Sequence, residues 1–273
     1  MADNRPIGVF DSGVGGLTVV KELRRCLPNE NIVYFGDTKR VPYGTKSDDT
    51  IKQFAREDEA FLLSQDVKLI VAACGTVSAV ASSTGNDLPV EFIGVVVKAA
   101  EAAVKATKNN RIGVIGTQAS IKSDAHRKEI LKLLPNANVY TKACSMFVPM
   151  VESGWTSSED VAVNRIVGEY LAPLKDQAVD TLILGCTHYP LLCDAIRKFM
   201  GDDVILINMG EATAQYVAER LAENSLLNTK EENGKCDIFV SDVTQAFCDT
   251  ASLIFDTKIT ENDITEVEIE GII

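Results

Sequence analysis

The sequence predicts an α/β protein of two similar α/β domains with largely parallel sheets, related by a pseudo-twofold axis, with the active site in the cleft between them. Apolar runs of strand length alternate with stretches of helix length, as in parallel sheets covered on both faces. Residues 67–76 and 180–190 share one plan, an apolar run that ends at a cysteine. Residues 5–13 and 110–118 also share a similar order of apolar and polar residues. A repeat this long indicates a duplicated α/β domain, not a solenoid.

The chain of 273 residues is long enough for two ordinary domains. We expect residues 1–98 and 212–273 to form the first domain and residues 99–211 to form the second. The tail is assigned to the first domain because a cleft that the chain crosses more than once keeps its geometry better.

The first half is expected to alternate strands and helices. Each strand is an apolar run with β-branched residues, and each helix follows a glycine-containing or polar turn. Strands are expected at residues 7–10, 31–37, in the run before Cys74 and at 90–97, and helices at 17–26, 48–65, 78–86 and 99–107.

The second half repeats this alternation. Ser157 or Ser158 is expected to cap its longest helix, and the polar residues 224–235 are expected to form a mobile linker before the tail. Strands are expected at residues 111–115, 137–143, 180–184, 204–207 and 236–240, and helices at 123–134, from the serine cap to 174, at 191–200, 212–223 and 243–255.

Composition and charge limit the function. A net charge of −12 argues against nonspecific binding of nucleic acid or of acidic membranes, because the field repels phosphates. An anionic small molecule held by local backbone amides stays possible. No run approaches the roughly 20 apolar residues of a membrane span, and no secretory signal is recognised. Seven cysteines without disulfide-framework spacing favour a reducing compartment, so a cytoplasmic location is expected.

Candidate site residues lie at the ends of the predicted strands. Asp11 and Ser12 open a glycine-rich loop whose spacing differs from the dinucleotide-binding pattern, so we expect them to face the crevice. The alternative for Asp11 is a helix N-cap. Cys74 and Cys186 end their strands at the edge where α/β sheets bind ligands, and the helix that follows each favours a thiolate.

Two histidines and one acid are interpreted next. His188 lies two residues from Cys186, which favours a functional role, whereas His126 on a charged helical face is expected to be exposed. Glu152 is expected either to be solvated or to reach the cleft. The other five cysteines are expected to be structural.

Two opposed thiols fit one chemistry best. A metal site is not favoured, because Cys74, Cys186 and His188 lack ligand spacing and a fourth partner. A Cys-His hydrolase needs one thiol and leaves the other unexplained. Racemisation of an amino acid without a cofactor needs a base on one face of the α-carbon and an acid on the other, and a thiolate and a thiol supply both.

Together the loops resemble the glutamate racemase family, within the aspartate/glutamate racemases. The resemblance extends from about residue 7 to beyond residue 211. It is carried by the segments 11–19, 42–44, 73–76, 147–152 and 185–192. It implies cofactor-independent interconversion of L- and D-glutamate, with D-glutamate used for peptidoglycan, and assembly as a homodimer.

The resemblance also implies the site residues. Cys74 and Cys186 would be the catalytic thiols, with Asp11 and His188 assisting their proton transfers and Glu152 a further candidate for that duty. Substrate-binding residues would be Asp11, Ser12, Pro42, Tyr43, Gly44, Gly75, Thr76, Thr117, Thr187 and His188.

The chain departs from the family pattern at four positions. Gly75 replaces a usual asparagine, Ser120 a threonine, Met209 a frequent serine, and Lys98 lies where proline is usual. Gly75 cannot supply a side-chain amide, which removes about 1 kcal/mol of hydrogen bonding. An active but weakened or altered enzyme is therefore expected. The alternatives are a racemase of another acidic amino acid and a weak amino-acid-binding paralogue.

Overall fold

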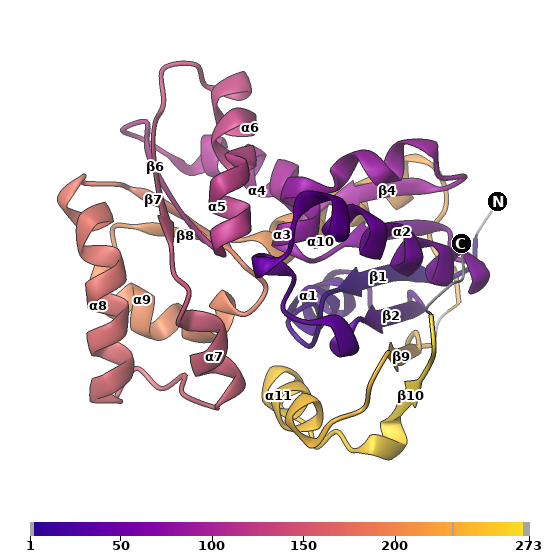
Figure 1. Cartoon of the computed structure of the whole chain (residues 1–273). Coiled ribbons are helices and arrows are strands. Elements are labelled where there is room, and N and C mark those ends of the chain that lie inside the picture. The colour runs from indigo at the N-terminus through magenta and orange to yellow at the C-terminus, as the bar shows by residue number, and fades with distance from the viewer. Residues whose placement is uncertain (1–2, 231, 270–273) are drawn as a thin grey trace.

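The computed structural model describes residues 3–230 and 232–269. The first two residues, Glu231 within the expected linker and the last four residues of the expected first domain lie outside this part. The described chain forms two sheets in which every strand pair is parallel (Figure 1). The α/β fold class predicted from the sequence is therefore confirmed.

The first sheet has the order β10-β9-β2-β1-β3-β4 and the second has β6-β5-β7-β8. The orders β2-β1-β3-β4 and β6-β5-β7-β8 correspond, as a duplication requires. The strands are β1 (Ile7–Asp11), β2 (Ile32–Gly36), β3 (Leu69–Ala72), β4 (Glu91–Gly94), β5 (Arg111–Gly116), β6 (Asn138–Ala143), β7 (Thr181–Gly185), β8 (Ile205–Asn208), β9 (Cys236–Val240) and β10 (Ile264–Glu266).

Helices cover both faces of each sheet. They are α1 (Leu17–Cys26), α2 (Asp48–Ser64), α3 (Gly75–Val80), α4 (Val95–Ala106), α5 (Gln118–Ser123), α6 (Ala125–Leu133), α7 (Phe147–Glu152), α8 (Val161–Asp176), α9 (Cys193–Met200), α10 (Met209–Glu223) and α11 (Gln245–Phe255). Short 3-10 turns lie at Thr38–Arg40, Tyr43–Thr45, Ser82–Asp87, Tyr189–Leu192 and Glu261–Asp263.

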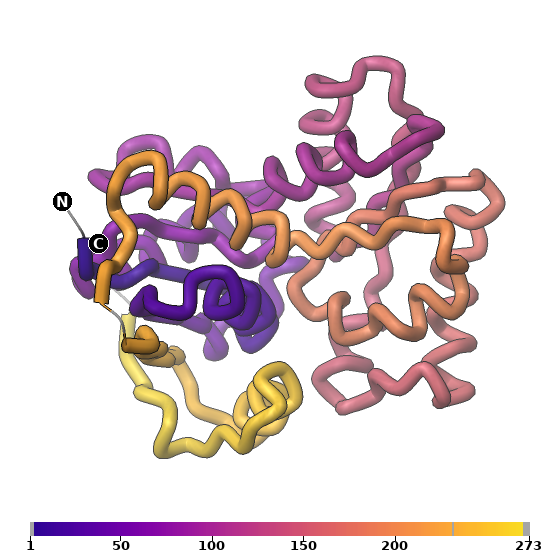
Figure 2. Tube along the Cα trace, turned by 180° about the vertical axis from the view of Figure 1, so that it is seen from behind, coloured from indigo at the N-terminus to yellow at the C-terminus, as the bar shows by residue number. Residues whose placement is uncertain are grey.

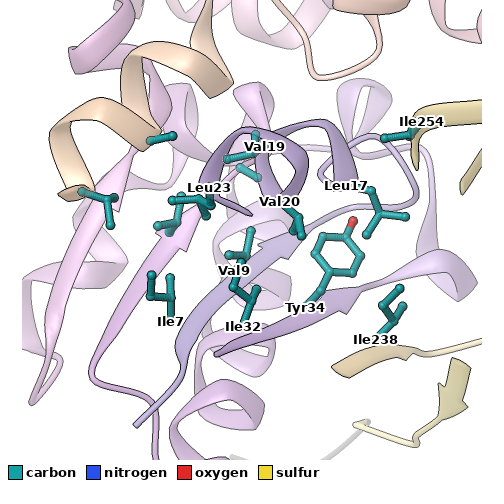
Figure 3. Close-up of a cluster of buried hydrophobic side chains, with 14 of the residues drawn as sticks. Ile7, Val9, Leu17, Val19, Val20, Leu23, Ile32, Tyr34, Ile238 and Ile254 are labelled. Atoms are coloured by element: carbon teal, nitrogen blue, oxygen red, sulfur yellow. The ribbon is translucent and has the colours of Figure 1, made fainter. Parts of the chain in front are cut away.

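Strand alternation divides the apolar residues between the two faces of each sheet. In β1, Val9 packs with α1 and α10, whereas the next residue, Phe10, packs with α2 on the opposite face. Figure 3 shows the first of these clusters, in which the side chains of α1 lie over β1 and β2. These buried faces hold the carboxyl ends of the strands in fixed positions.

Two helices connect the halves. α4 leads from the first sheet to the second, α10 leads back, and the two pack against each other (Figure 2). The tail returns to the first sheet as expected, because β9 pairs with β2 and β10 with β9. The expected boundaries at residues 98/99 and 211/212 fall within α4 and α10, and the division into domains stays a prediction.

Several local predictions were wrong. The helix expected at 123–134 is present as α6, but the short helix α5 before it was not predicted, and Asp124 separates the two in a left-handed conformation (φ 59°). Asp160 caps α8 in place of either serine, since its carboxylate accepts from two amides of the first turn. In place of the helix expected at 78–86, α3 spans Gly75–Val80 and a 3-10 turn follows at Ser82–Asp87.

Three further differences concern short or polar stretches. The strand expected at 90–97 ends at Gly94, where α4 begins, and the three-residue β10 was not predicted. The expected linker 224–235 is anchored at Asn228, which is buried and donates its backbone amide to Glu30 (2.7 Å).

Across the residues that the structure describes, no helix combines the length and apolar character that a membrane span requires.

Candidate active site

Four strand ends meet between the halves and bring the two predicted thiols into one site. Cys74 follows β3 at the start of α3, and Cys186 follows β7. Both side chains are buried, at 5% and 7% exposure. Hydroxyl groups join the halves around them: the Thr76 and Thr117 hydroxyl oxygens lie 3.0 Å apart, which brings the N-termini of α3 and α5 together. The site is therefore built from both copies of the repeat.

Asp11 links the two halves on the other side. Its Oδ2 accepts a hydrogen bond from the Thr187 hydroxyl (3.1 Å), and its Oδ1 accepts from the Gly13 amide (3.0 Å). The N-cap of α1 is Gly16, so the alternative interpretation of Asp11 as that helix cap is wrong. Burial raises the pKa of Asp11, although the nearby His188 charge and its hydrogen-bond donors partly offset this.

A short chain of polar contacts connects Asp11 to the first thiol. The Ser12 hydroxyl lies 3.2 Å from Asp11 Oδ1 and 3.7 Å from the Cys74 sulfur. Burial, together with the negative charges of Asp11 and Cys186, raises the pKa of Cys74 to about 12. Cys74 is therefore a protonated thiol near neutral pH, with a carboxylate one hydroxyl away.

The second thiol has a different partner. His188 Nδ1 lies 3.8 Å from the Cys186 sulfur, and its Nε2 lies 3.0 Å from Glu152 Oε1. Burial lowers the pKa of His188, but the contacts with Cys186 and Glu152 outweigh it and raise this pKa to about 10. Glu152 ends α7 with its side chain about half exposed, so it is both solvated and within reach of the site. His188 is thus positioned to exchange a proton with Cys186.

The two halves approach closely because glycines of the first half meet loops of the second. A Cβ at Gly15 would lie 2.3 Å from the Thr187 hydroxyl oxygen and 2.6 Å from the His188 ring. A Cβ at Gly75 would lie 2.7 Å from the carbonyl oxygen of Gly185. Neither position has room for a side chain, so both fix the spacing between the thiol-bearing loops.

The Pro42–Gly44 loop of the first half lies against Thr117 of the second half. The Tyr43 ring is buried, and its hydroxyl donates to Asp37 and lies 3.1 Å from Asp58. Pro42 is exposed, and a Cβ on Gly44 would lie 3.2 Å from Thr117 Cβ in the second half. Any substrate contact from this loop therefore comes from backbone groups, since the tyrosine hydroxyl is occupied.

Two residues near the site were misjudged or missed. His126 is 1% exposed, so the expectation of an exposed histidine was wrong: it packs 3.4 Å from the position of a Cβ on Gly185. Burial lowers the pKa of His126 to about 4, and neither ring nitrogen has a partner within the described residues. The Ser120 hydroxyl, in the first turn of α5, is also buried and unpartnered. Both lie on apolar helix faces that only the tertiary packing reveals.

The five other cysteines differ in their burial. Of the five other cysteines, Cys144 and Cys248 are buried in the core and Cys26, Cys193 and Cys236 are partly buried. Over residues 3–230 and 232–269, no group of three or more histidine, cysteine, aspartate or glutamate side chains is arranged to hold a metal ion. The site thus offers two thiols with separate proton partners, surrounded by hydroxyls and two helix N-termini.

Comparison with known proteins gives a consistent result. The family model described as Asp/Glu/Hydantoin racemase matches residues 7–217. The glutamate racemase of Geobacter metallireducens is 43% identical over 268 residues, which cover 98% of this chain and 98% of that protein.

Solved structures agree. The glutamate racemase of Francisella tularensis, in complex with D-glutamate, superposes with a TM-score of 0.90 at 40% identity and covers 98% of this chain and 99% of its own. A glutamate racemase isoform of Bacillus anthracis gives a TM-score of 0.91 at 37% identity, with 98% of each chain covered.

Proposed function

The chain belongs to the Asp/Glu/hydantoin racemase family and is an amino-acid racemase, and on this premise we propose that it interconverts L- and D-glutamate through two opposed thiols without a cofactor. The observation that carries the proposal is the pair of buried cysteines, Cys74 and Cys186, one from each half, each beside its own proton partner. A one-thiol hydrolase would use only the Cys186–His188 pair.

The proton transfers are assigned from these contacts. His188 takes the Cys186 proton, and the resulting thiolate removes the α-proton from one face of the amino acid, breaking the C–H bond and leaving the electron pair on the α-carbon and carboxylate. The Cys74 thiol donates its proton to the opposite face, which completes the inverted product. Cys74 is then the thiolate and Cys186 the thiol, so the opposite enantiomer reacts by the same steps reversed.

The partners of each thiol have separate duties. On the Cys74 side, Asp11 acts through the Ser12 hydroxyl and receives or returns a proton as the thiol changes state. On the Cys186 side, Glu152 orients the His188 ring and stabilises its protonated form. The raised pKa of Asp11 moves this carboxyl toward neutral pH, where it can exchange a proton, whereas the His188 pKa of about 10 keeps the ring protonated once it holds the Cys186 proton.

Substrate carboxylates would be held by donors that do not depend on the net charge of the protein. The N-termini of α3 and α5 supply backbone amides, and Thr76, Thr117 and Thr187 supply hydroxyls. Gly75 would contribute its backbone amide only, and the main chain of the Pro42–Gly44 loop, whose Gly44 lies against Thr117, would supply further polar groups. The substrate ammonium would face Asp11 and Ser12.

We further propose that the D-glutamate product supplies peptidoglycan synthesis in the cytoplasm and that the protein assembles as a homodimer. Light scattering after size exclusion tests the assembly. A substrate panel of L-aspartate, L-glutamate and L-glutamine tests the alternative that another acidic amino acid is the preferred substrate.

The racemase proposal is tested with purified protein and L-glutamate, followed by chiral analysis without added cofactor. D-glutamate should form with the unmodified chain and should be undetectable with Cys74→Ser or Cys186→Ser. Cys193→Ser is the matched control, because Cys193 lies seven residues beyond Cys186 and outside the contacts described above. Substantial racemisation by either catalytic-cysteine variant would contradict the two-thiol assignment. Glutamate binding without turnover by the unmodified chain would favour the binding paralogue.

A further inference from the structure

The C-terminal tail contacts the loop that leads to the proposed substrate site. Ser241 follows β9, beyond residue 217 where the family match ends, and its side chain is buried. Its hydroxyl donates to Asp37 Oδ1 (2.9 Å) and accepts from the backbone amide of Lys39 (2.9 Å). Both bonds therefore go to the segment that follows β2.

A second link joins the same two segments. The Thr38 hydroxyl donates to the Asp242 carbonyl (2.6 Å) and accepts from the Asp242 amide (2.9 Å). The tail and the loop are thus connected by four hydrogen bonds across about 200 residues of sequence. A β9–β2 pairing alone would not require side-chain bonds at this point.

Asp37 carries the connection into the substrate loop. Its Oδ2 accepts from the Tyr43 hydroxyl and from Arg40 Nε (2.6 Å). Arg40 is held in turn by Glu57 and Asp58, and its guanidinium lies 4.0 Å from the centre of the Phe54 ring. Asp37 is fully buried, and within residues 3–230 and 232–269 its two oxygens are satisfied by Ser241, Tyr43 and Arg40.

We propose that Ser241 is a positioning residue for the Pro42–Gly44 loop, acting through Asp37 and Tyr43. The inference rests on the proposed function, because it assigns this loop to glutamate binding. Ser241 and Tyr43 hold opposite oxygens of one carboxylate. Removing the Ser241 hydroxyl leaves Oδ1 of this buried group without its donor, so the carboxylate can turn about the bond that Arg40 keeps to Oδ2, and its bond to Tyr43 weakens. The loop then occupies its binding conformation for only part of the time, and the apparent affinity falls by that fraction.

The test compares steady-state racemisation and calorimetric glutamate binding for Ser241→Ala and the unmodified chain. If about one molecule in ten keeps the binding conformation, KM and Kd rise about tenfold while kcat stays within about twofold, since bound substrate reorders the loop. Ser241→Thr keeps the hydroxyl and should restore KM. Thr38→Val breaks the second link and should raise KM less.

The matched control is Thr244→Ala. Thr244 caps α11 in the same tail, where its hydroxyl accepts from the Phe247 amide (3.2 Å), and it makes none of the bonds to residues 37–39. It should lower the melting temperature without changing KM. An unchanged KM and Kd for Ser241→Ala, or an equal rise in KM for Thr244→Ala, would overturn the inference. Glutamate binding without racemisation by the unmodified chain would overturn the proposed function alone, because the Kd comparison still decides the role of Ser241.

Discussion

Replacing Gly75 with alanine should lower kcat/KM for glutamate by about 5- to 160-fold while the protein stays folded. A Cβ at this position would lie 2.7 Å from the Gly185 carbonyl oxygen and 3.2 Å from Met209 Cε. The methionine methyl can rotate away, but the carbonyl belongs to the main chain immediately before Cys186. Overpacking of this kind costs about 1–3 kcal/mol, and each 1.36 kcal/mol is a factor of ten in rate.

The loss should appear in catalysis because the contact crosses from one half to the other. The chain relieves it by moving the loops of Cys74 and Cys186 apart, which lengthens the distance that the proton must be carried on each side of the substrate. Racemisation is followed by circular dichroism of glutamate, and stability by urea unfolding of the same samples.

Three variants make the interpretation specific. Gly168→Ala is the control, since Gly168 lies in α8 and an added Cβ meets only the movable ring of Phe199 at 3.2 Å. Gly75→Ala/Met209→Ala should recover little activity, because the carbonyl contact remains. Gly75→Asn should be slower still, although it restores the side chain usual in the family. A kcat/KM within about twofold of the unmodified chain for Gly75→Ala would refute the close-approach argument.

Other predictions concern pH and the buried hydroxyl and histidines. His188→Asn should lower kcat by about 100-fold or more, because Cys186 loses its proton acceptor; a pH–rate profile checks it, and activity near that of the unmodified chain would exclude this role. Folding raises the His188 pKa from 6.5 to about 10, so the contribution of His188 to stability is complete below about pH 6.5 and is lost as the pH rises through 10. The unfolding free energies of the unmodified chain and His188→Asn should therefore converge over that pH range. The His126 pKa is instead lowered to about 4, so the unfolded chain binds the extra proton and the free energy of unfolding falls by up to about 3 kcal/mol between pH 6.5 and 4. His126→Phe should remove this part of the pH dependence. If the unfolding free energies of the variant and the unmodified chain change in parallel with pH, His126 is not the group responsible. Tyr43→Phe should destabilise the protein by about 1–3 kcal/mol in urea unfolding, because two buried carboxylates lose a donor, and an unchanged midpoint would show that the network reorganises.

The predicted fold depended on periodicity and repetition, and both are strong in this chain. The strand runs before Cys74 and Cys186 are short, apolar and β-branched, so their identity as buried parallel strands follows from composition alone. The corresponding strand orders of the two sheets agree with the repeat detected in the sequence. The short helix α5 was missed because its six residues carry little periodicity, and the left-handed Asp124 that separates it from α6 has no reliable local signal.

The site was predictable in its strand-end residues and not in its supporting contacts. The structure brings Cys74, Asp11 and Cys186 together as predicted, because parallel strands present their carboxyl ends at one edge, and their catalytic roles stay a proposal. The buried state of His126 depends on how α6 packs over the second sheet, and its charged neighbours suggested the opposite. The link from Ser241 to Asp37 joins residues 204 positions apart, so no local pattern contains it.

The two-thiol mechanism is tested most directly by racemising α-protiated L-glutamate in D2O and measuring the isotope at the α-carbon of the first D-glutamate formed. Thiols exchange with solvent, so a Cys74 thiol that protonates the face opposite Cys186 must deliver deuterium. The account predicts D-glutamate with deuterium at the α-carbon from the earliest time point, while the remaining L-glutamate is still largely protiated. D-glutamate that retains the original protium would show that a single base returns the same proton, and the assignment of Cys74 and Cys186 as opposed acid and base would be wrong.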